Sequence, residues 1–144
     1  AYMDANGIKY VEKVVSNSSE VQQAAQSLVG SVDAIFCPND SVVQAAMPQI
    51  AQIAREAKIP VYGSSAVMVN SGAFATISIS DTEIGAISAD MADQILKGTP
   101  VSEVPAKVVD VFTTVINQNT ADAIGASLSD DVKANAVLVE DSAQ

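Results

Sequence analysis

The stretch that decides the fold is VDAIFC at residues 32–37, followed at once by PNDS at residues 38–41. The first part is a short apolar run, interrupted near its start by Asp33, and such runs are typical of strands buried in a sheet. The second part contains residues that favour turns and helix starts. Apolar residues then recur at helical spacing over residues 43–57. The stretch therefore predicts a strand, a turn and a helix.

Outward from this stretch, short apolar runs alternate with segments of helical spacing. Further strands are predicted at residues 8–15, 59–62, 74–79 and 107–116. Helices are predicted at residues 18–30, 43–57, 65–69, 81–98 and 117–125, with a polar, weakly helical tail from residue 126. Pro48 is expected to kink or divide its helix, because proline lacks the backbone N–H. This alternation predicts an α/β fold with a largely parallel sheet.

The composition predicts one globular domain and excludes some partners. The chain has 144 residues, of which 49% are hydrophobic but only 4% aromatic, so the core must be aliphatic. It carries 17 acidic and 7 basic residues, a net charge of −10. An acidic surface repels nucleic-acid phosphates and anionic membrane surfaces. Neither is therefore an expected partner.

Enzymatic motifs are missing from the sequence. There is no histidine, which removes the usual catalytic triads and the commonest transition-metal ligand. Cys37 is the single cysteine and is expected to be a small buried residue. Glycine-rich phosphate loops, nucleophile elbows and CxxC pairs are also missing. We therefore expect no enzyme, no cofactor and no metal site.

Polar residues follow the predicted strands where ligands bind in open α/β sheets, at the strands' carboxyl ends. The carboxylate of Asp40 could pair with a ligand ammonium, while helix N-termini at this edge favour an anionic group. Together they suit a zwitterion such as an amino acid. The candidate ligand-binding residues are Asp40, Asn39, Ser41, Ser18, Ser19, Ser64, Ser65 and Asp81.

A purely structural role remains open for each candidate. Serine and aspartate are preferred helix N-caps, and this interpretation applies to Ser18, Ser19, Ser41, Ser65 and Asp81. Asn39 and Asp40 could equally be turn formers.

The order and spacing of several segments resemble the substrate-binding proteins of ABC importers with a type I periplasmic-binding fold. The similar branch includes binders of tryptophan and other aromatic amino acids. Near Glu83 that family often has an aromatic residue, whereas Asp81 and Thr82 precede Glu83 here, which leaves the ligand open. The matching segments are residues 7–15, 17–22, 28–29, 32–36, 38–41, 57–63, 71–76, 83–85, 95–98, 115–117 and 121–125.

The resemblance implies one lobe of a two-lobed protein, with a three-layer Rossmann-like sheet and flanking helices. The chain resembles the second half only, without the first lobe and without the first strand of the second lobe. Residues 1–80 would form the core of the ligand-binding lobe. Residues 81–144 would supply a crossover helix, a long strand and a C-terminal helix. Asp40 and its neighbours would face the cleft, with Ser18, Ser19 and Ser64 on the same side.

The resemblance also implies a function and partners. The expected function is an extracytoplasmic solute-binding component, in the periplasm or as a membrane-anchored lipoprotein, which delivers a small molecule to ABC permease subunits. Ile84, Ile87, Met91 and Ile95 form an apolar helix face that the other lobe would normally cover. We expect this chain to dimerise through that face, with or without exchange of elements, or to belong to a larger protein.

Two other functions share this type of fold. One is a ligand-sensing effector domain of a receptor or transcription regulator. The other is a flavodoxin-like enzyme or regulator, against which the missing histidine and phosphate-loop motifs weigh.

Overall fold

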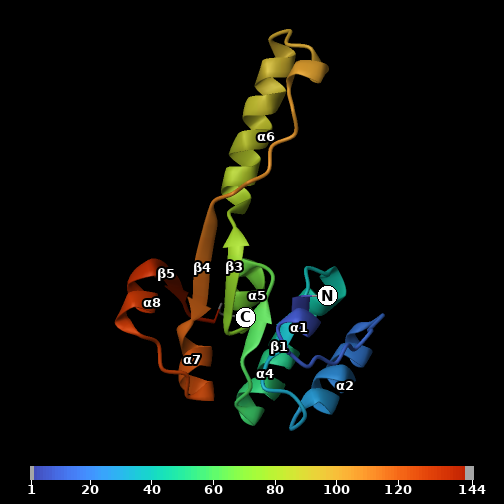
Figure 1. Ribbon diagram of the computed structural model, residues 1–144, viewed down its shortest axis with the longest axis vertical. Coiled ribbons are helices and arrows are strands. Elements are labelled where there is room, and N and C mark those ends of the chain that lie inside the picture. Colours follow the sequence, from blue (N-terminus) through green and yellow to red (C-terminus); the bar gives the residue numbers. More distant parts are fainter. Residues whose placement is uncertain (1, 142–144) are drawn as a thin grey trace.

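The computed structural model describes residues 2–141. Within these residues five strands form one sheet in the order β1-β2-β3-β4-β5 (Figure 1). The first three strands are mutually parallel, β4 is antiparallel to β3, and β5 is parallel to β4. The α/β prediction is confirmed, with the β3–β4 pair as the antiparallel exception. The strands are β1 (Ile35–Cys37), β2 (Val61–Gly63), β3 (Ala75–Ile79), β4 (Phe112–Asn117) and β5 (Ala136–Val139).

Helices connect and flank these strands. Pro48 divides its helix as predicted, because it lies in the first turn of the second piece, where a backbone N–H would lack an intrahelical partner. The helical elements are α1 (Tyr2–Ala5), α2 (Ser18–Leu28), α3 (Ser41–Ala45), α4 (Met47–Ala57), α5 (Ala66–Asn70), α6 (Asp81–Leu96), the 3₁₀ turn η1 (Val101–Glu103), α7 (Gln118–Ile124) and α8 (Asp130–Asn135).

The hydrophobic core lies on one face of the sheet, which we call the closed face. Side chains of a strand alternate between the two faces, so Ile35, Cys37 and Val61 point to the closed face together. There they pack against α2, α3, α4 and α5, whose Met47 and Met68 are fully buried. The core is aliphatic, as the composition predicts.

The opposite face, which we call the open face, is largely uncovered. Phe36, Tyr62 and Ile77 alternate with the buried residues and are 68%, 41% and 72% exposed. Helix α8 and the loop before it cover part of this face, where Leu128 and Val132 border an apolar pocket. Half of the sheet's capacity for burial is therefore unused in this chain.

The strand predicted at residues 8–15 is wrong. These residues have irregular backbone and are exposed, except for the half-buried Val15. A strand needs a hydrogen-bonded neighbour, and within the described residues β1 pairs with β2 alone. The outer edge of β1 consequently has no strand beside it.

Two predictions for the C-terminal part also need correction. The long strand over residues 107–116 is β4, which begins only at Phe112, where its pairing with Ile79 of β3 begins. The tail from residue 126 is not merely weakly helical, because it contains α8 and also β5. The strand was missed because its apolar run is only AVLV at residues 136–139.

Helix α6 and the segment that returns from it project away from the sheet (Figure 1). No residue of α6 is buried. In the described part of the chain, no helix combines the length and apolar character that crossing a membrane requires.

Candidate ligand-binding edge

The carboxyl ends of β1 and β2 lie level with each other. The parallel register pairs Ile35 with Val61 and Cys37 with Gly63. The chain therefore leaves both strands at the same edge of the sheet. Residues 38–41 emerge directly beside Ser64 and Ser65.

Asp40 combines a structural role with an exposed position. It is the N-cap of α3, and its Oδ1 accepts hydrogen bonds from the backbone N–H groups of Val42 at 2.8 Å and Val43 at 3.0 Å. The hydrogen bonds of Asp40 among the described residues engage Oδ1 alone. Since the side chain is exposed, Oδ2 remains able to receive a cationic group. Capping and ligand binding are therefore compatible in this residue.

The predicted caps hold at only one of the five positions. Ser65 caps α5 by accepting a hydrogen bond from Met68 N at 3.4 Å. Ser41 is not a cap, because Asp40 occupies that position and Ser41 begins the helix.

Ser18 and Ser19 are not caps either, because Asn17 precedes them as the N-cap of α2. Asn17 accepts a hydrogen bond from Glu20 N at 3.0 Å, and the Glu20 carboxylate accepts from Ser16 N at 2.7 Å. This reciprocal arrangement is a capping box, which the Asn-x-x-Glu pattern could have revealed. Both serines are exposed in the first turn.

Asp81 is likewise the first residue of α6, and Ser80 caps that helix through Glu83 N at 3.3 Å. Tyr62 pairs with Ala75, so β3 continues to Ile79, well past the level at which β2 ends. Asp81 therefore lies farther out than the edge formed by β1 and β2.

The structure thus brings together part of the predicted set. Residues 39–41 and 64–65 share one edge, since they follow neighbouring strands in register. Ser18 and Ser19 start α2, which contacts α3. They come from residues 8–15, however, which join no strand.

An apolar pocket of about 550 Å³ lies on the open face and reaches this edge at Gly63 and Ser64. Phe36, Tyr62 and Phe74 are its aromatic lining, and the rings of the last two meet edge to face at 5.7 Å. The sequence analysis missed this lining. The signal was present, because an aromatic residue occupies the middle of both three-residue strands.

A polar network lies at the other end of the sheet. Arg55 donates to both carboxylate oxygens of Asp141, at 2.8 Å and 2.7 Å. The hydrogen bond from Arg55, and a further one from Asn117, hold the pKa of the Asp141 carboxyl below its usual value, although burial acts in the opposite direction. Because β4 runs antiparallel to β3, Asn117 at its carboxyl end lies away from the ligand-binding edge. This network therefore stabilises the fold and does not contact a ligand at that edge.

Comparison with known proteins decides the family. A family model described as ABC transporter substrate binding protein matches residues 1–140. The chain belongs to this family.

Relatives of this substrate-binding chain bind aromatic amino acids or belong to solved structures. A tyrosine-binding protein of Clostridioides difficile is 36% identical over 123 residues, which cover 85% of this chain and 36% of that protein. The ligand-free, open structure of a Clostridium difficile substrate-binding protein with adhesive properties has a TM-score of 0.82 at 34% identity. It is matched over 98% of this chain and 47% of its own.

Two further structures superpose equally well. A conserved domain protein of Vibrio cholerae has a TM-score of 0.82 at 30% identity, with 94% of this chain and 46% of that chain covered. A Streptococcus pneumoniae ABC domain in complex with L-Trp has a TM-score of 0.82 at 25% identity, with 96% and 47% covered. The chain spans about half the length of these structures. Both the predicted family and the predicted single lobe are confirmed.

The remaining chemistry of this substrate-binding chain fits a binding family rather than an enzyme family. Burial raises the pKa of the Cys37 thiol to about 11, so the group stays protonated at neutral pH and is a poor nucleophile. No cluster of three potential metal ligands occurs within residues 2–141.

Proposed function

We propose that this chain is the C-terminal lobe of a solute-binding component of an ABC importer, and that it holds an amino acid in a cleft against a second lobe. The observation that carries the proposal is the exposed Oδ2 of Asp40 at the edge where β1 and β2 end. A carboxylate in this position suits the ammonium group of an amino acid. The names of two relatives, which refer to tyrosine and L-Trp, support this ligand class.

The neighbouring polar residues would complete the contacts. Asn39, Ser41, Ser64 and Ser65 offer short donors and acceptors at the same edge. Ser18, Ser19 and Asp81 would belong to the rim, reached by a ligand only after the two lobes close. Closure supplies much of the burial of a small ligand, so one lobe alone is expected to bind weakly.

The division of the chain follows the same proposal. Residues 1–80 form the core of the ligand-binding lobe, and residues 81–144 supply the elements that pass between the lobes or pack on them. The projection of α6 from the sheet supports such a crossover (Figure 1). The protein would act outside the cytoplasm, in the periplasm or as a lipid-anchored protein, and deliver its ligand to ABC permease subunits.

Asp40→Asn should abolish ligand binding while leaving α3 capped. Asparagine caps helices about as well as aspartate, but it lacks the charge that pairs with an ammonium group. The measurement is the thermal shift of the full-length protein with single amino acids, including tyrosine and tryptophan. A ligand that binds only the native state raises the melting temperature. The ligand-induced rise should disappear in the variant.

Asp40→Ala serves as the comparison, because it removes the cap together with the charge. Its ligand-free melting temperature should fall, by about 1 kcal/mol of cap stability, whereas that of Asp40→Asn should stay near the parent value. If Asp40→Asn binds as tightly as the parent, the role assigned to Asp40 is wrong. If no amino acid shifts the parent protein, the ligand class is wrong.

The apolar face of α6 gives a prediction about association. Ile84, Ile87 and Met91 are half-buried and Ile95 is 38% exposed, although α6 projects from the sheet. We propose that this face meets the other lobe in the full-length protein and a second copy in the isolated chain. Sedimentation at tens of micromolar concentration should show a dimer of residues 1–144, and Met91→Lys should return it to a monomer. A monomeric parent chain would contradict this proposal.

A further inference from the structure

The edge of the sheet beside β1 is built to receive a strand. Residues 9–15 make no backbone hydrogen bond to another segment within the described part of the chain. The outer edge of β1 is also unpaired there. A long unpaired segment next to an open sheet edge is unfavourable in a stable protein, because both leave backbone groups without partners.

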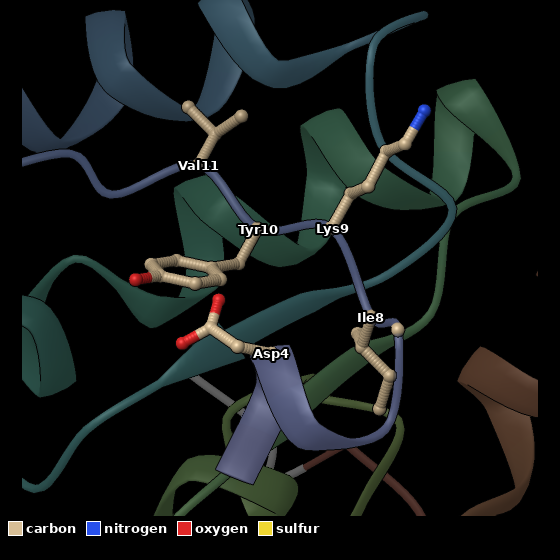
Figure 2. Close-up of a pocket in the computed structure, with 6 residues that line it drawn as sticks. Asp4, Ile8, Lys9, Tyr10 and Val11 are labelled. Carbon is tan, nitrogen blue, oxygen red and sulfur yellow. The ribbon is translucent and has the colours of Figure 1, made fainter. Parts of the chain in front are cut away.

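Next to this edge lies an open hollow of about 650 Å³, lined by Asp4 and residues 7–11. Figure 2 shows Ile8, Lys9, Tyr10 and Val11 running past α1, with the Tyr10 and Asp4 side chains directed toward one another. Gly7, at φ +66°, turns the chain sharply from α1 into this segment. The segment is thus held near the sheet without joining it.

The path of the chain shows which face the missing connection would use. Helices α2, α4 and α5 pack in the core on the closed face. They connect residues 8–15 to β1, then β1 to β2 and β2 to β3, all in one direction along the sheet. Crossovers between parallel strands are right-handed, so a step in the opposite direction requires the opposite face.

Such a reverse step is what α1 implies. Helix α1 leads directly into residues 8–15. If a strand lay between these residues and β1, the helix leaving that strand would run over the open face and end at α1. This arrangement has the 2-1-3 strand order of doubly wound sheets. The open face offers the helix a surface of Phe36, Tyr62 and Ile77 with an apolar pocket beside it.

We propose that this chain binds one strand–helix unit as an interaction surface: the strand enters parallel to β1, between β1 and residues 8–15, and the helix covers the open face before continuing into α1. The occupant is a segment of the half that the matched structures contain and this chain does not, since the chain covers only 46–47% of them. The unit needs an extended run that pairs by its backbone and an amphipathic helix that buries Phe36 and Tyr62. This inference is independent of the ligand proposed above.

The test is a chimera in which the roughly 30 residues that lead into the matched part of the Clostridioides tyrosine-binding relative are fused ahead of Ala1, the length of such a strand–helix unit. Amide hydrogen exchange is compared between the chimera and residues 1–144. We expect protection of residues 8–15 and 35–37 to rise by about 100-fold or more in the chimera, because paired amides exchange only after opening. The melting temperature should rise as well.

Two controls separate specific docking from general stabilisation. A fused segment of the same composition in scrambled order should leave residues 8–15 unprotected. Phe36→Lys in the chimera should weaken protection of residues 8–15, whereas Lys97→Ala, on the distant end of α6, should not.

Three outcomes would overturn the proposal. One is a chimera that folds but leaves residues 8–15 unprotected. Another is equal protection by the scrambled segment. The third is protection of residues 8–15 in the unfused chain that appears only with dimerisation, which would make a second copy the occupant.

Discussion

Asn117→Ala is expected to lower the free energy of unfolding by about 3 kcal/mol, because the buried asparagine satisfies several groups that would lose their partners. Its side chain is 0% exposed. It donates to Val69 O at 2.9 Å and to Asp141 Oδ1 at 2.8 Å. Its Oδ1 accepts from Thr120 N at 2.9 Å and so caps α7. Urea unfolding followed by circular dichroism would measure the loss.

Asn17→Ala is the matched control, since Asn17 is also an asparagine N-cap but is exposed. Water can replace its lost bonds, so the expected cost is about 1 kcal/mol. Equal losses for the two variants would show that burial of Asn117 contributes nothing beyond capping.

Gly72→Ala is expected to cost about 3 kcal/mol, since two penalties coincide at this position. Gly72 has φ +108°, which side-chain-bearing residues rarely adopt. A Cβ there would lie 2.7 Å from the Ala51 Cβ and 3.3 Å from Arg55 Nη2. The clash would also disturb the Gly72 carbonyl, which accepts from Thr120 Oγ1 at 2.8 Å. The same unfolding measurement applies.

Gly98→Ala isolates the backbone penalty, because Gly98 has a similar φ of +98° but an added Cβ would meet nothing within 4 Å. We expect a loss of about 1 kcal/mol there. If Gly98→Ala cost as much as Gly72→Ala, crowding against α4 would not be the cause.

These two variants also separate stability from binding. Asn117 and Gly72 belong to the network around Arg55, which lies at the other end of the sheet from Asp40. We expect both variants to leave the ligand affinity of the folded protein unchanged. Asp40→Asn should do the reverse, because it alters the proposed binding group and keeps the cap.

Local sequence signals predicted the elements that depend on neighbours along the chain. Apolar spacing placed α4, and Pro48 divided its predicted helix as expected. Gly125, in a left-handed conformation, ends α7 where the sequence predicted it. Signals of this kind act within a few residues, so no tertiary contact was needed to recognise them.

Predictions that depended on a distant partner failed more often. Residues 8–15 have the composition of a strand but no strand to pair with. β5 has only four residues, and it forms because β4 offers an edge to it. Composition alone cannot reveal whether such an edge is present.

The candidate site divides in the same way. The residue types of the PNDS turn identified Asp40 from the sequence alone, and the resemblance carried by the segment order led to the family. The parallel register then set residues 38–41 beside Ser64 and Ser65. That register is a contact between strands far apart in the sequence, so the sequence could suggest it only by analogy.

By itself, the sequence determined the α/β class, the main helices and the turn that follows β1. The tertiary structure alone decided that Asp40 keeps one carboxylate oxygen exposed while the other caps α3. It also decided that Phe36 and Tyr62 lie together on an uncovered face. The reason is physical: side-chain type and spacing act locally, whereas exposure and pairing depend on which distant segments fold against one another.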